Sequence, residues 1–261
     1  MLYTWNDSEI VYADLLRGID LNHDIRAEKI LGCCEQARQD KLDYVWIDTC
    51  CINKSSSAEL QEAINSMFAW YKSAKVCYAY LSDWTLWDQA EILSEYIPFR
   101  KCRWFTRGWT LQELIAPSNL IFYDQNWSQL GSKQSHADAL ETLTRIPRDA
   151  LLGGSLERYS VTDRLSWAKQ RQTRRPEDRA YSLLGIFDVS MPMIYGEGEQ
   201  KAFRRLMREI SESKANESSK FPMTYSQNRK PNVQHDVLAI RPSEPSLNVN
   251  AFNSNQGECD H

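Results

Sequence analysis

The chain has 261 residues, of which 42% are hydrophobic, and its formal net charge is -4 at pH 7. A chain of this length can bury one substantial core, so we expect one domain followed by a tail rather than two full domains. The acidic balance argues against a nucleic-acid-binding surface, and no stretch is apolar over the length that a membrane span needs. The first ten residues, MLYTWNDSEI, lack the basic and apolar regions of a secretory signal, so the expected location is the cytosol.

The seven cysteines do not predict a metal or redox site. Adjacent pairs stand at Cys33, Cys34 and at Cys50, Cys51, and neither pair has the C-x-x-C spacing of zinc or thioredoxin sites. The four histidines are scattered along the chain. We therefore expect no metal, and we interpret the thiols as small hydrophobic core residues of a reducing compartment.

Strands and helices alternate in the first half of the predicted fold. The expected helices carry apolar residues at helical spacing, and the expected strands are short aromatic or β-branched runs. In chain order these elements are a strand over residues 2–6, a helix over 26–40, a strand over 44–49 with a loop over 48–54, a helix over 56–74 and a strand over 76–81. A strand, a helix and a strand joined by short connections predict a right-handed, parallel βαβ unit.

The second half is predicted to become mainly helical. Residues 82–102 show no clean periodicity, so we interpret them as a long surface excursion. The elements expected after it are a helix over 103–117, a strand over 119–123, and helices over 135–144, 161–170, 174–187 and 201–210. Beyond residue 213 the composition shifts to Ser, Asn, Gln, Lys and Pro. We therefore expect a folded domain over residues 1–212 and a disordered tail over residues 213–261.

The stretch RWFTRGWTLQELIAP at residues 103–117 combines two tryptophans, two arginines and one carboxylate. Trp109 and Glu113 are four residues apart in the sequence, so in a helix both side chains lie on the same face. A carboxylate beside a large indole needs a partner or shifts its pKa upward. A simpler interpretation is an exposed Glu113 paired with Arg107 or a lysine.

Three blocks of the chain resemble the fungal heterokaryon incompatibility (HET) domain. They are YVWIDTCCIN at 44–53, RWFTRGWTLQELIAP at 103–117, and RAYSLLGIF at 179–187 running into MPMIYGEG at 191–198. Residues 109–114 also resemble, more distantly, the W-x-x-x-E-L helix of Toll/interleukin receptor (TIR) domains. HET domains usually begin with a fuller strand that ends in Trp-Gly. Because Asn6 follows Trp5 here, we expect a shortened first strand.

The resemblance implies an α/β fold with a TIR-like or flavodoxin-like, mostly parallel sheet flanked by helices, and a helical C-terminal part. In TIR domains that cleave NAD the glutamate of this helix is catalytic, so the resemblance gives Glu113 that role. NAD would then be a substrate, and no bound cofactor is expected. Ligands of open α/β sheets bind at the carboxyl ends of the strands. We therefore expect the substrate-binding residues to be Trp5, Asp48, Thr49, Asn53 and Trp109.

Each of these residues also has a structural interpretation. Asp48 can cap a helix or form an ion pair, and the tryptophans can pack in the core. Arg103 and Arg107 can bind phosphate or hold a carboxylate such as Glu113. The basic run at residues 171–175 is interpreted as a solvated loop.

Two functions of different class follow from the resemblance, which implies a role in regulated cell death when unlike hyphae fuse. One is an NAD glycohydrolase that acts through Glu113. The other is a non-catalytic signalling module that associates with protein partners or with copies of itself. The two are distinguished by whether Glu113 faces an open cleft or a filled, ion-paired core.

Overall fold

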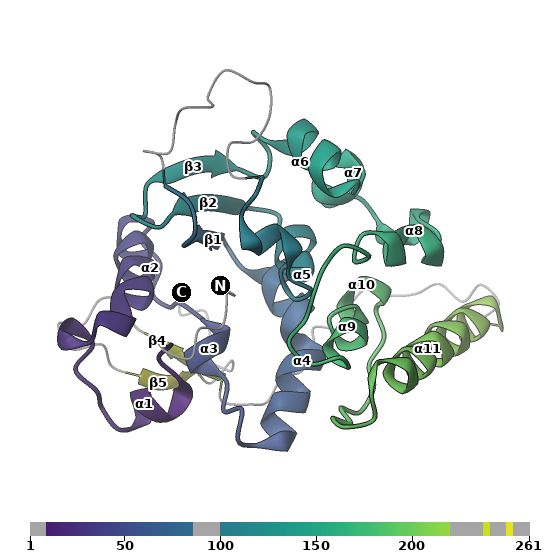
Figure 1. Cartoon of the computed structure of the whole chain (residues 1–261), viewed down its shortest axis with the longest axis horizontal. Coiled ribbons are helices and arrows are strands. Elements are labelled where there is room, and N and C mark those ends of the chain that lie inside the picture. Colours follow the sequence, from purple (N-terminus) through teal and green to yellow (C-terminus); the bar gives the residue numbers. More distant parts are fainter. Residues whose placement is uncertain (1–8, 86–99, 220–236, 241–248, 253–261) are drawn as a thin grey trace, which may run out of the picture. The chain divides into compact units, whose positions relative to one another are not determined.

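A computed structural model describes residues 9–85, 100–219, 237–240 and 249–252 (Figure 1). The chain divides into two compact units, which we describe separately. The central unit comprises Met1–Thr4 and Ser57–Lys214, and the terminal unit comprises Trp5–Ser56 and Ala215–His261. The predicted first strand and Trp5 lie outside the described residues, as does most of the predicted surface excursion.

The central unit contains a three-stranded mixed sheet. Its strands are β1 (Cys77–Leu81), β2 (Leu120–Asp124) and β3 (Gln129–Ser132), in the order β1-β2-β3. β1 pairs with β2 in parallel, whereas β2 pairs with β3 in antiparallel fashion. The chain is therefore mixed α/β, and only one of the two pairs in this sheet has the predicted parallel direction.

β3 was not predicted, because its sequence QLGS has no strand pattern. It forms because the turn before it is fixed by a side chain. The buried Asp124 carboxylate accepts hydrogen bonds from the backbone N–H groups of Asn126 (2.9 Å) and Ser128 (2.8 Å). Such side-chain bonds to the following backbone stabilise tight turns. This turn brings the chain back along β2.

The helices of the central unit lie beside and below this sheet in Figure 1. They are α4 (Ser57–Ser73), α5 (Thr110–Ile115), α6 (Ala137–Thr144), α7 (Arg148–Leu151), α8 (Val161–Ser166), α9 (Asp178–Tyr181), α10 (Leu184–Phe187) and α11 (Glu199–Ser219), the last of which continues into the terminal unit. α10 packs on α4 at Gly185, where an added Cβ would lie 2.1 Å from the Cβ of Phe68. Only glycine allows this close approach.

A hydrogen-bond network joins α9, the glycine turn after α10 and α11 in the C-terminal part of the central unit. The Glu177 carboxylate accepts from the backbone N–H groups of Gly196 and Gly198, each at 2.9 Å. The hydrogen bond from Gly198 is the largest cause that keeps the pKa of Glu177 below its ordinary value, and the bond from Gly196 acts in the same direction. The Glu197 carboxylate accepts from Arg205 at 2.6 Å and from the Tyr181 hydroxyl at 3.1 Å. The Gly-Glu-Gly sequence is thus a structural turn.

The terminal unit contains short helices and one longer one. They are α1 (Tyr12–Leu16), α2 (Glu28–Gln39) and α3 (Asp48–Cys51), with 3-10 turns at Leu21–His23 and Ile25–Ala27. Two strands, β4 (Val237–Ile240) and β5 (Val249–Phe252), pair in antiparallel fashion. These strands and the end of α11 are the described parts of the region predicted to be a disordered tail.

Of the strand predicted over residues 44–49, the described residues show a β-bridge at Val45 but no strand longer than that, so the predicted βαβ unit is not seen among them. The backbone is extended at Ile47, but a helical turn begins at Asp48. The Ile47 carbonyl accepts from the N–H groups of Cys50 (3.2 Å) and Cys51 (2.8 Å), so local helical bonds end the extended segment earlier than predicted. A short apolar run does not by itself distinguish a buried strand from a buried helical turn.

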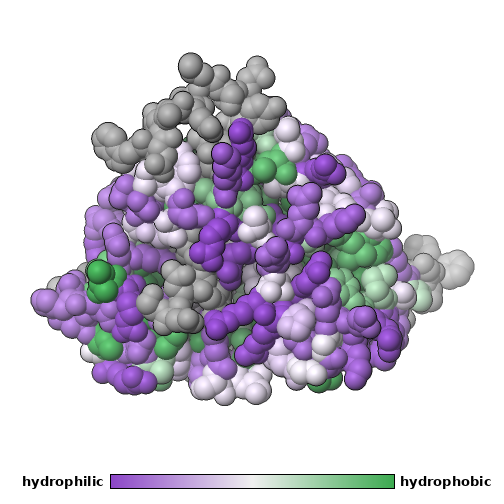
Figure 2. Space-filling view, in the orientation of Figure 1, coloured by the Kyte–Doolittle hydropathy of each residue, from purple (hydrophilic) through white to green (hydrophobic). Residues whose placement is uncertain are grey.

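The surface carries several large hydrophobic side chains. In the terminal unit Leu16 and Ile25 are exposed, and in the central unit Ile194 and Met207 are exposed. Most of the face in Figure 2 is nevertheless hydrophilic. Among the described helices, none has both the length and the apolar character needed to cross a membrane.

Candidate functional site

The helix that carries Glu113 is α5, which is shorter than the predicted helix over 103–117. A 3-10 turn occupies Arg103–Thr106, and the chain is extended at Arg107 before α5 begins. This break has a tertiary cause, because Gly108 N–H donates to the Gln172 carbonyl at 2.8 Å and Gln172 N–H donates to the Thr106 carbonyl at 2.6 Å. The backbone of Trp109 is helical, so its four-residue spacing to Glu113 is retained.

Glu113 lies inside the central unit. All six residues of α5 are buried, and Glu113 is 2% exposed. α5 contacts α4, α7 and the preceding 3-10 turn. A carboxylate at this depth needs compensation for its lost hydration.

Arg171 provides positive charge near Glu113. Its side chain is buried, and its Nη1 donates to the Arg107 carbonyl at 2.9 Å and to the Thr110 hydroxyl at 2.8 Å. Burial lowers the pKa of the Arg171 guanidinium to about 10, and the negative charge of Glu113 acts in the opposite direction. An opposite charge nearby favours the ionised form of a group. Glu113 and Arg171 are therefore two buried side chains of opposite charge that act on one another electrostatically.

A second buried cation, Lys133, holds the C-terminal end of α5. Its Nζ donates to the carbonyls of Leu114 (3.0 Å), Ile115 (3.4 Å) and Pro117 (2.5 Å). These carbonyls belong to the end of the helix, where backbone acceptors have no intrahelical partner. Burial lowers the pKa of Lys133 to about 8. Side-chain donors from two distant segments thus fix the two ends of α5.

Trp109 is partly exposed and has a structural partner. Its side chain lies near Asp178, whose carboxylate accepts from the Tyr195 hydroxyl at 3.0 Å. Burial raises the pKa of Asp178, and the side chains of Tyr195 and Trp109 act against that rise. The guanidinium of Arg175 stacks 4.1 Å from the centre of the Tyr195 ring. Trp109 therefore links α5 to the start of α9.

The other predicted site residues belong to the terminal unit. Asp48 and Thr49 are buried in α3. Asn53 fixes a turn, because its side-chain oxygen accepts from the N–H (3.2 Å) and the hydroxyl (2.6 Å) of Ser55. The structure therefore groups Glu113 with Trp109 in one unit and Asp48 with Thr49 and Asn53 in the other. Trp5 is not among the described residues.

Asp48 belongs to a cluster of charged side chains that sequence reasoning missed. Lys29 Nζ lies 3.4 Å from Glu9 Oε1. Burial raises the pKa of Glu9 and lowers that of Lys54, and the negative charge of Asp48 acts on both groups. The negative charges of Glu9 and Asp48 are thus compensated by the positive charges of Lys29 and Lys54, which supports the ion-pair interpretation of Asp48.

Arg171 was also missed, because the basic run at residues 171–175 was interpreted as a solvated loop. That interpretation holds for Arg174 and Arg175, which are exposed, but it is wrong for Arg171. The signal was present in the spacing, since Arg164, Trp167 and Arg171 follow i, i+3, i+7 and all three are buried. The periodicity was not recognised because two of the three residues are charged arginines rather than apolar residues.

Within the described residues, no group of three or more His, Cys, Asp or Glu side chains is arranged to hold a metal ion. The central unit therefore offers Glu113, Trp109 and Arg171 for chemistry, and the terminal unit separately offers its charged cluster.

Comparison with known proteins identifies the family. Residues 2–97 match the family model described as Heterokaryon incompatibility protein (HET). Over 213 residues, or 80% of this chain, the sequence is 47% identical to vegetative incompatibility protein HET-E-1 of Podospora anserina. This chain is a HET domain protein. It spans 16% of the length of that relative, and no solved structure matches it.

The three sequence blocks that suggested a HET domain have distinct structural roles. The block at 44–53 forms α3 and the turn at Asn53 in the terminal unit. The block at 103–117 forms α5, and the block at 179–198 forms α9, α10 and the glycine turn of the central unit. Gln112 joins the last two blocks, because its amide donates to the Ser182 carbonyl at 2.9 Å.

Proposed function

We propose that this HET domain protein acts in heterokaryon, or vegetative, incompatibility and triggers regulated cell death by associating with protein partners or with copies of itself. The relative named above supports the biological process. The burial of Glu113 supports the non-catalytic route, because a carboxylate that is 2% exposed is not open to a substrate. Because the chain spans 16% of that relative, its activator can be a segment or protein outside this sequence. We place this action in the cytosol.

NAD cleavage by a TIR-like mechanism is the second candidate. Trp109 and Glu113 keep their four-residue helical spacing, and Trp109 is partly exposed. In this mechanism Glu113 would bind the ribose hydroxyls and stabilise the positive charge that develops as nicotinamide leaves. The buried Glu113 would first have to become exposed, which requires α5 to move.

A TIR-like or flavodoxin-like fold is part of the same proposal. Its support is the parallel pairing of β1 with β2, with α5 in the connection between them and α4 directly before β1. Parallel strands joined through a helix are the unit from which such folds are built.

The experiment is expression of the wild-type chain and of Glu113→Gln in a fungal host, with measurement of cell death, cellular NAD and thermal stability. The proposal predicts that the wild type kills without prior loss of NAD. Glu113→Gln should lose both killing and stability, because it removes the negative charge that acts on the buried Arg171. The matched control is Glu141→Gln on the exposed side of α6, which should behave as wild type.

Growth temperature separates the two candidates further. If Glu113 is structural, Glu113→Gln regains killing at a lower temperature at which it folds. If Glu113 is catalytic, the variant stays folded at every temperature and never kills. Absence of killing by the wild type would contradict both candidates for this chain.

A further inference from the structure

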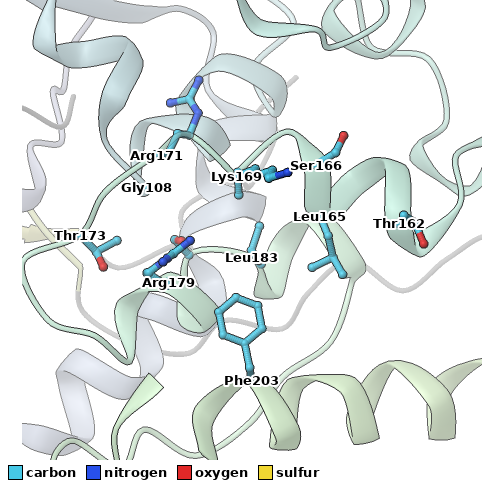
Figure 3. Close-up of a pocket in the computed structure, with 12 residues that line it drawn as sticks. Gly108, Thr162, Leu165, Ser166, Lys169, Arg171, Thr173, Arg179, Leu183 and Phe203 are labelled. Atoms are coloured by element: carbon cyan, nitrogen blue, oxygen red, sulfur yellow. The ribbon is translucent and has the colours of Figure 1, made fainter. Parts of the chain in front are cut away.

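The central unit contains a pocket of about 380 Å³ (Figure 3). It is lined mainly by α8 and the segment that follows it, by α9 and by α11. This volume is at the lower end of the range of roughly 300 to 1,000 Å³ that is typical of small-molecule sites. None of the roles given above to Glu113 or Trp109 uses this pocket. Neither residue lines it.

The charged residues that line the pocket are all cationic: Lys169, Arg171 and Arg179. Lys169 is exposed, and its ammonium forms no ion pair within the described part of the chain. Arg179 Nη1 lies 3.1 Å from Glu199 Oε1, and both side chains are 40% exposed. An exposed pair of this kind contributes little to stability, so the guanidinium can turn to a stronger anion at small cost.

Arg171 contributes to the wall of the pocket rather than to its charge. Its guanidinium points away from Leu183 and Phe203 in Figure 3 and donates to Thr110 and the Arg107 carbonyl. The cations available to a ligand are therefore Lys169 and Arg179.

The wall beside Arg179 is fixed by backbone contacts. Gly108 N–H donates to the Gln172 carbonyl at 2.8 Å. A Cβ at Gly108 would lie 2.4 Å from Thr173 Cγ2 and 3.3 Å from the Ser182 hydroxyl oxygen, so no side chain fits between these segments. Thr173 and Ser182 also line the pocket. Thr173 and Ser182 thus belong to a wall that is already formed without ligand.

The opposite part of the pocket is apolar. Leu165, Leu183 and Phe203 come from three different elements and line one continuous cavity with the cations (Figure 3). A pocket with an apolar wall and a few polar groups at one side binds a molecule that has an apolar body and a polar end.

We propose that this pocket binds a small phosphate ester with a flat apolar body, of the size of a nucleoside monophosphate. The phosphate would lie between Lys169 and Arg179, where arginine offers a planar pair of donors that matches phosphate oxygens. The flat body would lie against Leu165, Leu183 and Phe203. This binding does not depend on whether Glu113 is catalytic or structural.

The test is isothermal titration of the purified full chain with three probes: adenosine monophosphate, adenosine and inorganic phosphate. The monophosphate should bind, and the other two should bind at least about tenfold more weakly, since one contact of about 1.4 kcal/mol corresponds to a factor of ten. Lys169→Met should weaken binding of the monophosphate by about tenfold on the same scale. Glu199→Gln should tighten it, because the variant frees Arg179 from its carboxylate.

The matched control is Lys201→Met, which removes an exposed lysine of α11 that does not line the pocket. It should bind as the wild type does. Lys169 is exposed, so its replacement should leave the circular dichroism and the melting temperature unchanged.

Three outcomes would overturn the proposal. The monophosphate could fail to bind at millimolar concentration. Adenosine or inorganic phosphate could bind as tightly as the monophosphate, which would remove the need for either the cations or the apolar wall. Lys201→Met could weaken binding as much as Lys169→Met does, which would show attraction by net charge alone.

Discussion

The guanidinium of Arg171 donates a 2.8 Å hydrogen bond to the hydroxyl of Thr110, in the first turn of α5. Both side chains are buried, and the Thr110 hydroxyl also donates to the Trp104 carbonyl at 2.5 Å. The segment after α8 is thereby attached to the helix that carries Glu113.

Thr110→Val should lower the free energy of unfolding by about 1 to 3 kcal/mol, because a buried donor of Arg171 loses its acceptor while the side-chain volume is conserved. Urea denaturation followed by circular dichroism measures this. The control is Thr106→Val, whose hydroxyl donates to the Arg103 carbonyl at an exposed position. That change should cost less than about 0.5 kcal/mol. Equal effects of the two substitutions would contradict the role given to Thr110.

Gly185→Ala should destabilise the central unit by about 1 to 3 kcal/mol, as overpacking does. The added methyl group would meet Phe68 where α10 crosses α4. Thermal denaturation of Gly185→Ala, Phe68→Ala and the double variant tests this contact. The loss of stability in the double variant should be smaller than the sum of the losses in the two single variants. The methyl group added by Gly185→Ala would fill part of the cavity left by Phe68→Ala, and the clash with the Phe68 ring would be absent. Strict additivity would show that the helices do not meet there.

Lys133 should make stability rise with pH in the alkaline range. Its pKa is about 8 in the folded chain and 10.5 ordinarily, so between these values the unfolded chain binds a proton that the folded chain lacks. The free energy of unfolding then increases as pH rises. Relative to Lys133→Met, the wild type should gain about 3 kcal/mol between pH 7.5 and 10.5, at about 1.4 kcal/mol per pH unit.

Other groups titrate in the same range, so the Lys133 prediction is tested as a difference between variants. Denaturation curves of the wild type, Lys133→Met and the exposed control Lys75→Met are compared at each pH. Wild type and Lys75→Met should change in parallel. A constant difference between wild type and Lys133→Met would mean that Lys133 does not titrate in this window.

The buried cysteines should be unreactive in the folded chain. Burial raises the pKa of Cys33 and Cys34 to about 12 and that of Cys77 to about 11, and the thiolate is the reactive form. At pH 8 these three thiols should react with a thiol reagent only after denaturation. Mass spectrometry of the labelled peptides identifies each site. Rapid labelling of any of them in the native chain would contradict its burial.

Several elements could be predicted from the sequence because local pattern and tertiary environment agree. The helices over 26–40 and 56–74 are confirmed as α2 and α4, and the strands over 76–81 and 119–123 as β1 and β2. In each, apolar side chains at the correct period face the core. The spacing of Trp109 and Glu113 was also read correctly.

The cations around α5 could not be predicted, because they are distant in sequence. Arg171 stands 58 positions after Glu113, and Lys133, which follows β3, donates to the carbonyls at the end of α5, so neither is indicated by helical spacing. The break before α5 has the same origin, since Gln172 supplies its hydrogen bonds. Charged residues at buried positions are the places where composition misleads most.

The central claim is that the buried Glu113 carboxylate is structural and is coupled electrostatically to the buried Arg171 guanidinium. The most direct test is a double-mutant cycle of Glu113→Gln and Arg171→Met, measured by urea denaturation. Each single change should cost about 3 to 5 kcal/mol, because it removes one of two opposite charges that are both buried. The double variant should cost less than the sum by at least about 1 kcal/mol. A Glu113→Gln variant as stable as the wild type, with effects that simply add, would contradict the claim and favour a catalytic carboxylate.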